Sequence, residues 1–278
     1  MGSSAEAEEL KEAFRSRRSA AGIEELLMRD SGLPGPRINL RMAGEFARLT
    51  ALSAWRELDE AVAKWSRIGP DDAGTNEPRV ILPFCAMLAA GTGLAAASPE
   101  GQRSRRELLR RGMNDERWRI REAAAMGLQL AGEADFALLR ETVELWLEEA
   151  NELEQRGIIA ALAHPPLLRV KEQAHFALRT AESVLTRLAG REAQRRSEPE
   201  RVLIQALDYA VSVLAAAEPE EGFALLERMT EAEDARIRRI AAANLGKARL
   251  AKPHAGRVKR LLEGLDRVDR AANGDGSD

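Results

Sequence analysis

The stretch Asp115-Glu-Arg-Trp-Arg-Ile120-Arg-Glu-Ala-Ala-Ala-Met-Gly-Leu128 decides the fold, because a looser copy of it lies 117 positions later, counted from Ile120 to Ile237. The second copy reads Asp234-Ala-Arg-Ile237-Arg-Arg-Ile-Ala241-Ala-Ala-Asn-Leu245-Gly246. Each copy has an acid, an Ile-Arg pair, an Ala four residues after that Ile and a Leu eight residues after it. Self-similarity at this range predicts a protein built from repeated units that stack side by side.

The composition is that of a helical protein. Of the 278 residues, 45% are hydrophobic and 31% are charged, but only 4% are aromatic. A mixture dominated by Ala, Leu, Glu and Arg is typical of helices. No run of β-branched and aromatic residues alternates with polar residues over more than a few positions, as a strand would require. The sequence therefore predicts an all-α protein, with a length that suits one or two compact domains or one extended array.

Loops and apolar spacing divide the chain into four segments. The clearest loop runs from Gly69 to Pro78 and is rich in Gly, Pro and Asp, so we place a boundary at its end. From Ile38 to Ile68 apolar residues recur at helical spacing, which predicts one long helix or two with a break near Thr50. The predicted segments are a charged lead-in that is a frayed helix or partly disordered (1–19), an N-terminal helical segment (20–77), a repeat array (78–268) and a disordered tail (269–278).

Within the array the pattern predicts about five helix pairs. Their first helices begin roughly 40 residues apart, which is the period of stacked two-helix units. The small residues at 123–125 and 241–243 would let neighbouring helices approach closely. The predicted pairs are 78–97 with 104–112, 117–130 with 134–152, 155–163 with 167–191, 200–216 with 221–230, and 235–249 with 254–268.

The two quoted copies resemble HEAT repeats, in which a turn carrying Asp precedes a helix that opens with Val/Ile-Arg. The resemblance is good over 115–130 and 234–249, moderate between them, weak over 78–112, and does not extend to the first 70 residues. It implies an α-solenoid of the HEAT and armadillo type. Most such proteins are binding scaffolds, but some are enzymes, so the fold alone does not select a function.

Signatures of catalysis are scarce. The three histidines form no His-Glu-x-x-His, and neither Cys-x-x-Cys nor Gly-x-Ser-x-Gly occurs, so we expect no catalytic residue, metal or cofactor. The single cysteine, Cys85, lies in an apolar run that predicts a buried thiol. The Gly91-Thr-Gly93 sequence lacks a third glycine and predicts a close contact between helices. The acidic N-terminus and the lack of an apolar stretch near ~20 residues indicate a cytoplasmic protein with no membrane partner.

Charge is segregated along the chain. From Arg236 to Arg260 there are nine Lys or Arg and no Asp or Glu, and a second basic run extends from Arg103 to Arg121. In a structural interpretation, Asp115 and Asp234 cap helices and pair with Arg121 and Arg238 at the turns between units. In a functional interpretation, the runs bind a partner. The candidate partner-binding residues are then Arg103, Arg106, Arg110, Arg117, Trp118, Arg121, Arg236, Arg238, Arg239 and Lys247.

Two functions remain open. The first is a non-enzymatic scaffold that binds a protein partner, such as an acidic segment, on a concave face formed by the second helices of successive pairs. The alternative is nucleic-acid binding, in which both arginine runs converge on one groove with Trp118 exposed between them. The stretch Arg117 to Ala125 also resembles the Trp-Val-Arg-Arg-Ala-Ala runs of HEAT-like alkylpurine DNA glycosylases. That resemblance implies base excision in a basic groove, with Trp118 and Asp115 near the lesion.

Overall fold

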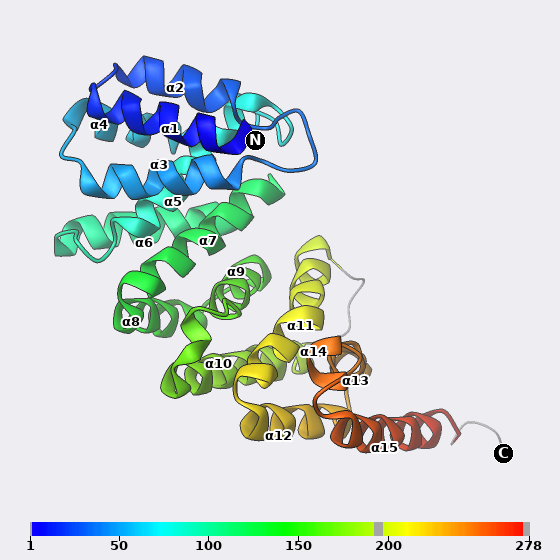
Figure 1. Ribbon diagram of the computed structural model, residues 1–278. Helices are drawn as coiled ribbons and strands as arrows, with labels where there is room; N and C mark the ends of the chain where they lie inside the picture. Colours follow the sequence, from blue (N-terminus) through cyan, green and yellow to red (C-terminus); the bar gives the residue numbers. More distant parts are fainter. Residues whose placement is uncertain (1, 192–196, 275–278) are drawn as a thin grey trace. The chain divides into compact units, whose positions relative to one another are not determined.

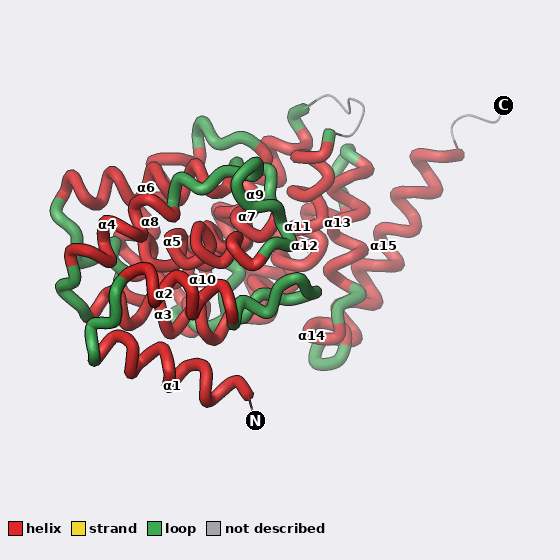
Figure 2. The backbone as a smooth tube through the Cα atoms, turned by 90° about the horizontal axis from the view of Figure 1, so that it is seen from above, coloured by secondary structure: helices red, strands yellow, loops and turns green. Residues whose placement is uncertain are grey.

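Helices are the sole regular structure in the part of the chain that the computed structural model describes, residues 2–191 and 197–274 (Figure 2). The all-α prediction is therefore confirmed for these residues. The chain forms two compact units, residues 1–142 (unit 1) and 143–278 (unit 2). The loop from Gly69 to Pro78, where the sequence placed a boundary, lies inside unit 1.

Unit 1 contains the first helices of the chain, and α8 crosses from it into unit 2. The predicted helical stretch from 38 to 68 is two helices, because Ser53 is extended (φ −110°, ψ 136°) and ends the first of them. The elements are α1 (Gly2–Arg15), α2 (Ala20–Arg29), α3 (Leu40–Leu52), α4 (Arg56–Trp65), the 3-10 turn η1 (Pro78–Val80), α5 (Ile81–Thr92), α6 (Pro99–Met113), α7 (Trp118–Ala134) and α8 (Phe136–Leu147).

The charged lead-in contributes to the core of unit 1. Residues 2–15, expected to be a frayed helix or partly disordered, form α1, which packs on α3. Leu10 is completely buried, and the Phe14 ring meets Phe46 of α3 edge-on at 5.9 Å between centroids. Leu10 and Phe14 are four positions apart along α1, which places both on the face that meets the core. The charged residues between them remain outside the core.

The helices α3, α5 and α7 pack in one row, with α5 in the middle (Figure 1). Every residue of α5 from Ile81 to Gly91 is buried, which explains its continuous apolar sequence. A Cβ added to Gly91 would lie 1.9 Å from the carbonyl oxygen of Gly127 on α7, so only glycine permits this crossing. The predicted helix contact at Gly91 is thus confirmed.

Unit 2 repeats this arrangement with α9, α11 and α13 in one row. A second row is formed by α10, α12 and α15, because α12 packs on both α10 and α15 (Figure 1). The predicted tail overlaps the end of α15, and residues 275–278 lie outside the described part of the chain. The elements are α9 (Glu152–Leu162), the 3-10 turn η2 (Leu167–Arg169), α10 (Lys171–Ala189), α11 (Glu198–Ala217), α12 (Pro219–Thr230), α13 (Ala235–Leu245), α14 (Ala248–Ala251) and α15 (Ala255–Gly274).

A buried amide joins the two helices at the centre of unit 2. The side chain of Asn244 on α13 accepts the N–H of Ser212 (2.7 Å) and donates to the carbonyl of Leu207 (2.9 Å), both on α11. It also donates to the carbonyl of Ile240 (2.8 Å). Both polar ends of a fully buried Asn are therefore satisfied, and the α11 turn from 207 to 212 is fixed against α13.

Candidate binding surfaces

The first copy of the repeat signature places Arg117 inside the protein, where it is 4% exposed. Asp115 accepts the N–H of Arg117 and both Nε and Nη2 of its side chain, each at 2.8 Å. The guanidinium then donates to the carbonyls of Ile68, Gly69 and Ala73 at 2.8–3.0 Å, in the loop that follows α4. Arg117 thus satisfies carbonyl groups beyond the end of a helix, where no helical N–H is available.

The second copy does the same in unit 2. Asp234 caps α13 by accepting the N–H of Arg236 at 2.7 Å, and Nη2 of Arg236 also bonds this carboxylate at 2.6 Å. Nη2 further donates to the carbonyls of Leu188 and Arg191 at the end of α10. Nη1 reaches the Glu200 carboxylate at 3.2 Å. Burial would raise the pKa of Asp234, but the hydrogen bonds from Arg236 outweigh it and hold that pKa below its ordinary value.

The second arginine of each copy bonds the turn before its own helix. Nη1 of Arg121 donates to the carbonyls of Asp115 and Glu116, and Nη1 of Arg238 donates to those of Ala232 and Glu233. The predicted pairing is corrected here: the carboxylates of the signature bond Arg117 and Arg236, two positions along, while Arg121 and Arg238 bond main-chain carbonyls. The predicted cap is also corrected in the first copy: Asp234 is the N-cap of α13, whereas the N-cap of α7 is Arg117, and Asp115 precedes it by two residues.

The remaining predicted residues are divided between the interior and the surface. Arg106 is buried, and its Nε donates to Thr142 at 3.0 Å; Arg110 is half-buried. Arg103 is exposed on α6, and Lys247 is half-buried at the start of α14. Arg239 is exposed and pairs with Asp208 at 3.4 Å. The two basic runs are therefore largely structural at Arg106, Arg117, Arg236 and Arg238.

Trp118 is 50% exposed, as the nucleic-acid hypothesis expected. The guanidinium of Arg119 lies 4.4 Å from the centroid of its ring. That guanidinium is already bound, because it donates to the carbonyls of Thr75 and Gly35 and to the Asn76 side chain. Trp118 therefore stands beside an arginine that is held by the protein itself.

A groove of about 750 Å³ lies between α4 and α6 in unit 1, which we call the α4–α6 groove. Its floor is α5, and its walls are half-buried and exposed residues of α4 and α6. The groove is deep because the side chains at its floor are small. Four small residues recur at helical spacing along one face of α5 and at the position directly after it. The floor residues are Ala86, Ala89, Ala90 and Gly93.

Three arginines face the α4–α6 groove. Arg105 is half-buried and donates to the carbonyl of Ala89 at 3.1 Å; burial lowers its pKa, and the nearby Asp59 opposes that shift. Arg67 and Arg111 are exposed and have no ion pair within the described residues. Both also line an adjoining cavity of about 470 Å³, so guanidinium groups from both walls stand where the two hollows meet.

The acidic groups of the α4–α6 groove are Asp59 on α4 and Glu107 on α6. Burial raises the pKa of Asp59, and Arg105 acts against this. Arg67 was missed by the sequence interpretation because it stands alone after α4. Arg105 and Arg111 were inside the predicted basic run, and their spacing with Leu108 at three-residue steps was the available signal that they share a face of α6.

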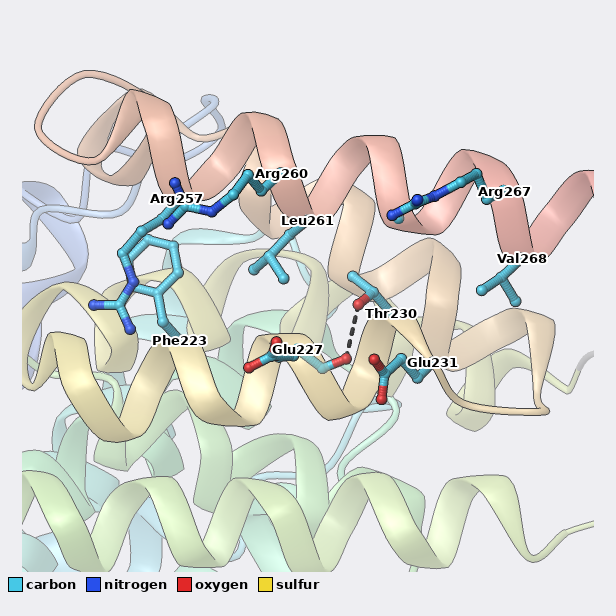
Figure 3. Close-up of a pocket in the computed structure, with 10 residues that line it drawn as sticks. Phe223, Glu227, Thr230, Glu231, Arg257, Arg260, Leu261, Arg267 and Val268 are labelled. Atoms are coloured by element: carbon cyan, nitrogen blue, oxygen red, sulfur yellow. Dashed lines mark hydrogen bonds between the residues drawn. The ribbon is translucent and has the colours of Figure 1, made fainter.

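A second groove, of about 570 Å³, separates α12 from α15 in unit 2 (Figure 3). Leu261 and Val268 point from α15 toward α12, while Arg260 and Arg267 lie on the same helix opposite Glu227 and Glu231 of α12. These arginines and carboxylates form no ion pairs with one another across the groove. Arg257 also lines this groove, but it is paired with Glu220 outside it, so the two carboxylates of α12 and its end offset Arg260 and Arg267 and leave little net preference for an anion.

A third candidate is the exposed surface around Tyr209 on α11, the only tyrosine of the chain. Its ring is 53% exposed, and the guanidinium of Arg249 lies 4.3 Å from the ring centroid. No sequence motif identified Tyr209 as a candidate binding residue. The available signal was its position on the polar face of α11, opposite the apolar face. An aromatic residue is more often found on the apolar face, in the core.

Cys85 is fully buried, and burial raises the pKa of its thiol far above the ordinary value. Within residues 2–191 and 197–274 no group of three or more His, Cys, Asp or Glu side chains is arranged to hold a metal ion. Among the same residues, no helix combines the length and apolar character needed to cross a membrane. Comparison with known protein families and with curated proteins found no match for this chain.

Proposed function

We propose that this chain is a non-enzymatic helical-repeat scaffold, built from HEAT-like helix pairs, that binds an acidic segment of a partner protein in the α4–α6 groove. The observation that supports the proposal is the convergence of Arg67, Arg105 and Arg111 on one groove of about 750 Å³. Of the two walls, α6 is the second helix of the first predicted pair, and α4 belongs to the N-terminal helical segment before the array.

The chemistry of the groove suits carboxylates. A guanidinium binds a carboxylate through two parallel hydrogen bonds, and this interaction is stronger where water is partly excluded, as it is at the half-buried Arg105. Arg67 and Arg111 lack carboxylate partners within the described residues, so an incoming Asp or Glu displaces no internal ion pair there. The low floor of α5 leaves room for main chain as well as side chains, which favours a peptide.

Excision of bases is not part of the proposal. Both oxygens of the Asp115 carboxylate are bonded to Arg117, whose other donors bind main-chain carbonyls. A carboxylate held in this way serves the turn before α7. To act as a general base or to stabilise a cationic sugar, Asp115 would have to leave Arg117 buried without its counter-ion, which is costly.

Selection of peptides tests the proposal. A displayed library of random 12-residue peptides is selected on the full chain, and the recovered peptides are measured by fluorescence anisotropy against the wild type and R67E/R111E. Both substituted residues are exposed, so the fold is retained. We expect Asp- and Glu-rich peptides that bind R67E/R111E at least about tenfold more weakly, since each 1.4 kcal/mol is a factor of ten.

The matched control is R56E/R103E, which makes the same charge change at exposed residues outside the groove. This variant should bind the peptides within about twofold of the wild type, apart from the small effect of long-range charge. Recovery of peptides without acidic residues, or equal loss of binding in the two double variants, contradicts an acidic ligand in the α4–α6 groove.

A further inference from the structure

The surface around Tyr209 is formed by three elements of unit 2. Arg201, Gln205 and Tyr209 are exposed and follow one face of α11 at four-residue spacing. Arg239 of α13 reaches this face, because it pairs with Asp208 of α11. Three further cations come from α14 and the residues on either side of it, namely Lys247, Arg249 and Lys252. We call this set the Tyr209 surface: Arg201, Gln205, Asp208, Tyr209, Arg239, Lys247, Arg249 and Lys252.

The basic run from Arg236 to Arg260 supplies most of its charge. Arg236 and Arg238 are bound inside the fold, Arg257 pairs with Glu220, and Lys259 pairs with Glu263. Arg260 lines the α12–α15 groove. The members left over are those of the Tyr209 surface. Lys247, Arg249 and Lys252 have no carboxylate partner among the described residues, and Arg249, the middle one of the three along the chain, lies against the Tyr209 ring.

The main chain that carries the Tyr209 ring is held by the fold. The Asn244 side chain bonds the main chain of α11 at Leu207 and Ser212, on either side of Tyr209. The Ser212 hydroxyl donates to the carbonyl of Tyr209 at 2.8 Å. The guanidinium of Arg249 lies against the ring. The backbone position of Tyr209 is therefore fixed, and a planar cation already lies on its ring before any ligand arrives, which reduces the entropy that binding must overcome.

We propose that the Tyr209 surface binds single-stranded nucleic acid. Unpaired bases stack on the Tyr209 ring and the Arg249 guanidinium, while Lys247, Lys252 and Arg201 contact phosphates on either side. Exposed aromatic rings combined with cations are the common chemistry of single-strand binding, because every base has a face that stacks. The one acidic group of the surface, Asp208, is paired with Arg239 and so repels phosphate weakly.

An acidic peptide fits this surface less well. Carboxylates need only cations, and a peptide rich in Asp and Glu leaves the exposed planar pair of Tyr209 and Arg249 without a stacking partner. A base satisfies that pair, and the phosphates between bases satisfy the cations. This inference concerns unit 2 alone and does not depend on the α4–α6 groove of unit 1.

The test uses the full chain and a fluorescein-labelled 20-residue oligothymidylate, with anisotropy measured from about 50 to 200 mM salt. We expect Y209L to weaken binding about tenfold at every salt concentration, because stacking on an aromatic ring is lost while charge is unchanged. We expect K247S/K252S to weaken binding and to reduce the slope of log K against log salt by about 1.4, at about 0.7 per phosphate contact.

Two matched controls separate this site from general attraction. W118L removes an equally exposed aromatic residue whose arginine is bound by carbonyls, and it should leave binding within twofold. K64S/R169S removes two exposed cations elsewhere and should also have little effect. Circular dichroism confirms that each variant is folded.

Three outcomes overturn the proposal. One is a Y209L protein that binds the oligonucleotide as well as the wild type does, which would mean attraction by charge alone. Another is a polyglutamate that competes for the surface at equal charge and loses affinity equally in Y209L, which would assign the surface to acidic protein segments. Loss of oligonucleotide binding in R67E/R111E would likewise move the site to unit 1.

Discussion

The centres of the two units solve the same packing problem in different ways. Counted from Ile120 and Ile237, Gly127 of α7 and Asn244 of α13 occupy the same position, one residue before the Leu of each signature. In unit 1, Gly127 lets α7 approach α5 so closely that a Cβ would lie 2.7 Å from the carbonyl oxygen of Met87. In unit 2, Asn244 bonds the main chain of α11 at Leu207 and Ser212.

The difference shows that the two copies of the signature bring neighbouring helices together by different means. In unit 1 a glycine removes the side chain from the crossing, and in unit 2 an amide side chain bonds the main chain of the neighbouring helix. By contrast, Arg117 and Arg236 have kept the same role. Each donates to a carbonyl 48 residues earlier, that of Gly69 or of Leu188.

The largest effect is expected from replacing Arg117, and it should differ from the effect of replacing Arg236. R117M removes the counter-ion of Asp115 and leaves the carbonyls of the loop after α4 without a donor, which should destabilise unit 1 by about 3 kcal/mol. Cys85, the single cysteine, is buried in α5 of unit 1 and reports opening of that unit. We expect a thiol reagent to label Cys85 about 100-fold faster in native R117M, since 1.4 kcal/mol is a factor of ten.

The paired variant is R236M, in which the equivalent carbonyls lie in unit 2. Its loss of stability should appear in hydrogen exchange of α10 and α13, while the labelling rate of Cys85 stays close to that of the wild type. Equal acceleration of labelling by R117M and R236M would show that the two units open together, and the comparison between them would then describe one cooperative structure.

An intermediate effect is expected at the two helix crossings. G127A places a methyl group against Leu109 and the carbonyl of Met87 and should cost about 1–3 kcal/mol through overpacking. N244A removes the three hydrogen bonds of a fully buried amide and should cost about 2 kcal/mol. Urea unfolding measures both losses, and hydrogen exchange at Ser212 should increase in N244A alone.

The control for the glycine substitution is G44A. A Cβ on Gly44 has no atom within 4 Å, so alanine should be neutral or stabilise α3 by up to about 1 kcal/mol. A G127A protein as stable as G44A would mean that α7 shifts away from α5 at little cost, and the close crossing in unit 1 would not be needed.

The smallest effect concerns pH. The pKa of Asp234 is held below its ordinary value, so its ionised form contributes stability above about pH 4, and this contribution is lost as the pH falls through the folded pKa. D234N keeps a capping oxygen but removes the charge. We expect D234N to exchange α13 amides faster than the wild type at pH 6, by on the order of 1 kcal/mol of protection, and the difference should shrink as the pH falls below about 4.

A difference between D234N and the wild type that persists unchanged down to pH 3 would contradict this explanation. It would mean that the shape of the Asp234 side chain, and not its charge, holds the turn before α13.

The sequence predicted the helices well because each of them buries an apolar face, and apolar spacing is visible in one dimension. The α5 contact at Gly91 was also predicted, since a glycine in an apolar helix has few other roles. The lead-in was less clear: its charges hide Leu10 and Phe14, whose burial depends on α3, a helix 30 residues away in the chain. Arg67 carried no local signal, because the residues that surround it come from other helices. Tyr209 was marked only as an aromatic residue on the polar face of an apolar helix, and its partner Arg249 comes from another helix.

By itself, the sequence determined an all-α chain with two copies of one signature, since the period of apolar residues and the Asp-x-Arg turn are local properties. Only the tertiary structure decided which arginines are available to a ligand. The Asp-x-Arg motif distinguishes Arg117 and Arg236 from Arg103 and Arg249 in the sequence, but it does not show that carbonyl groups 48 residues earlier bind the first two. A charge is internal or external according to what folds against it, and that depends on contacts between distant parts of the chain.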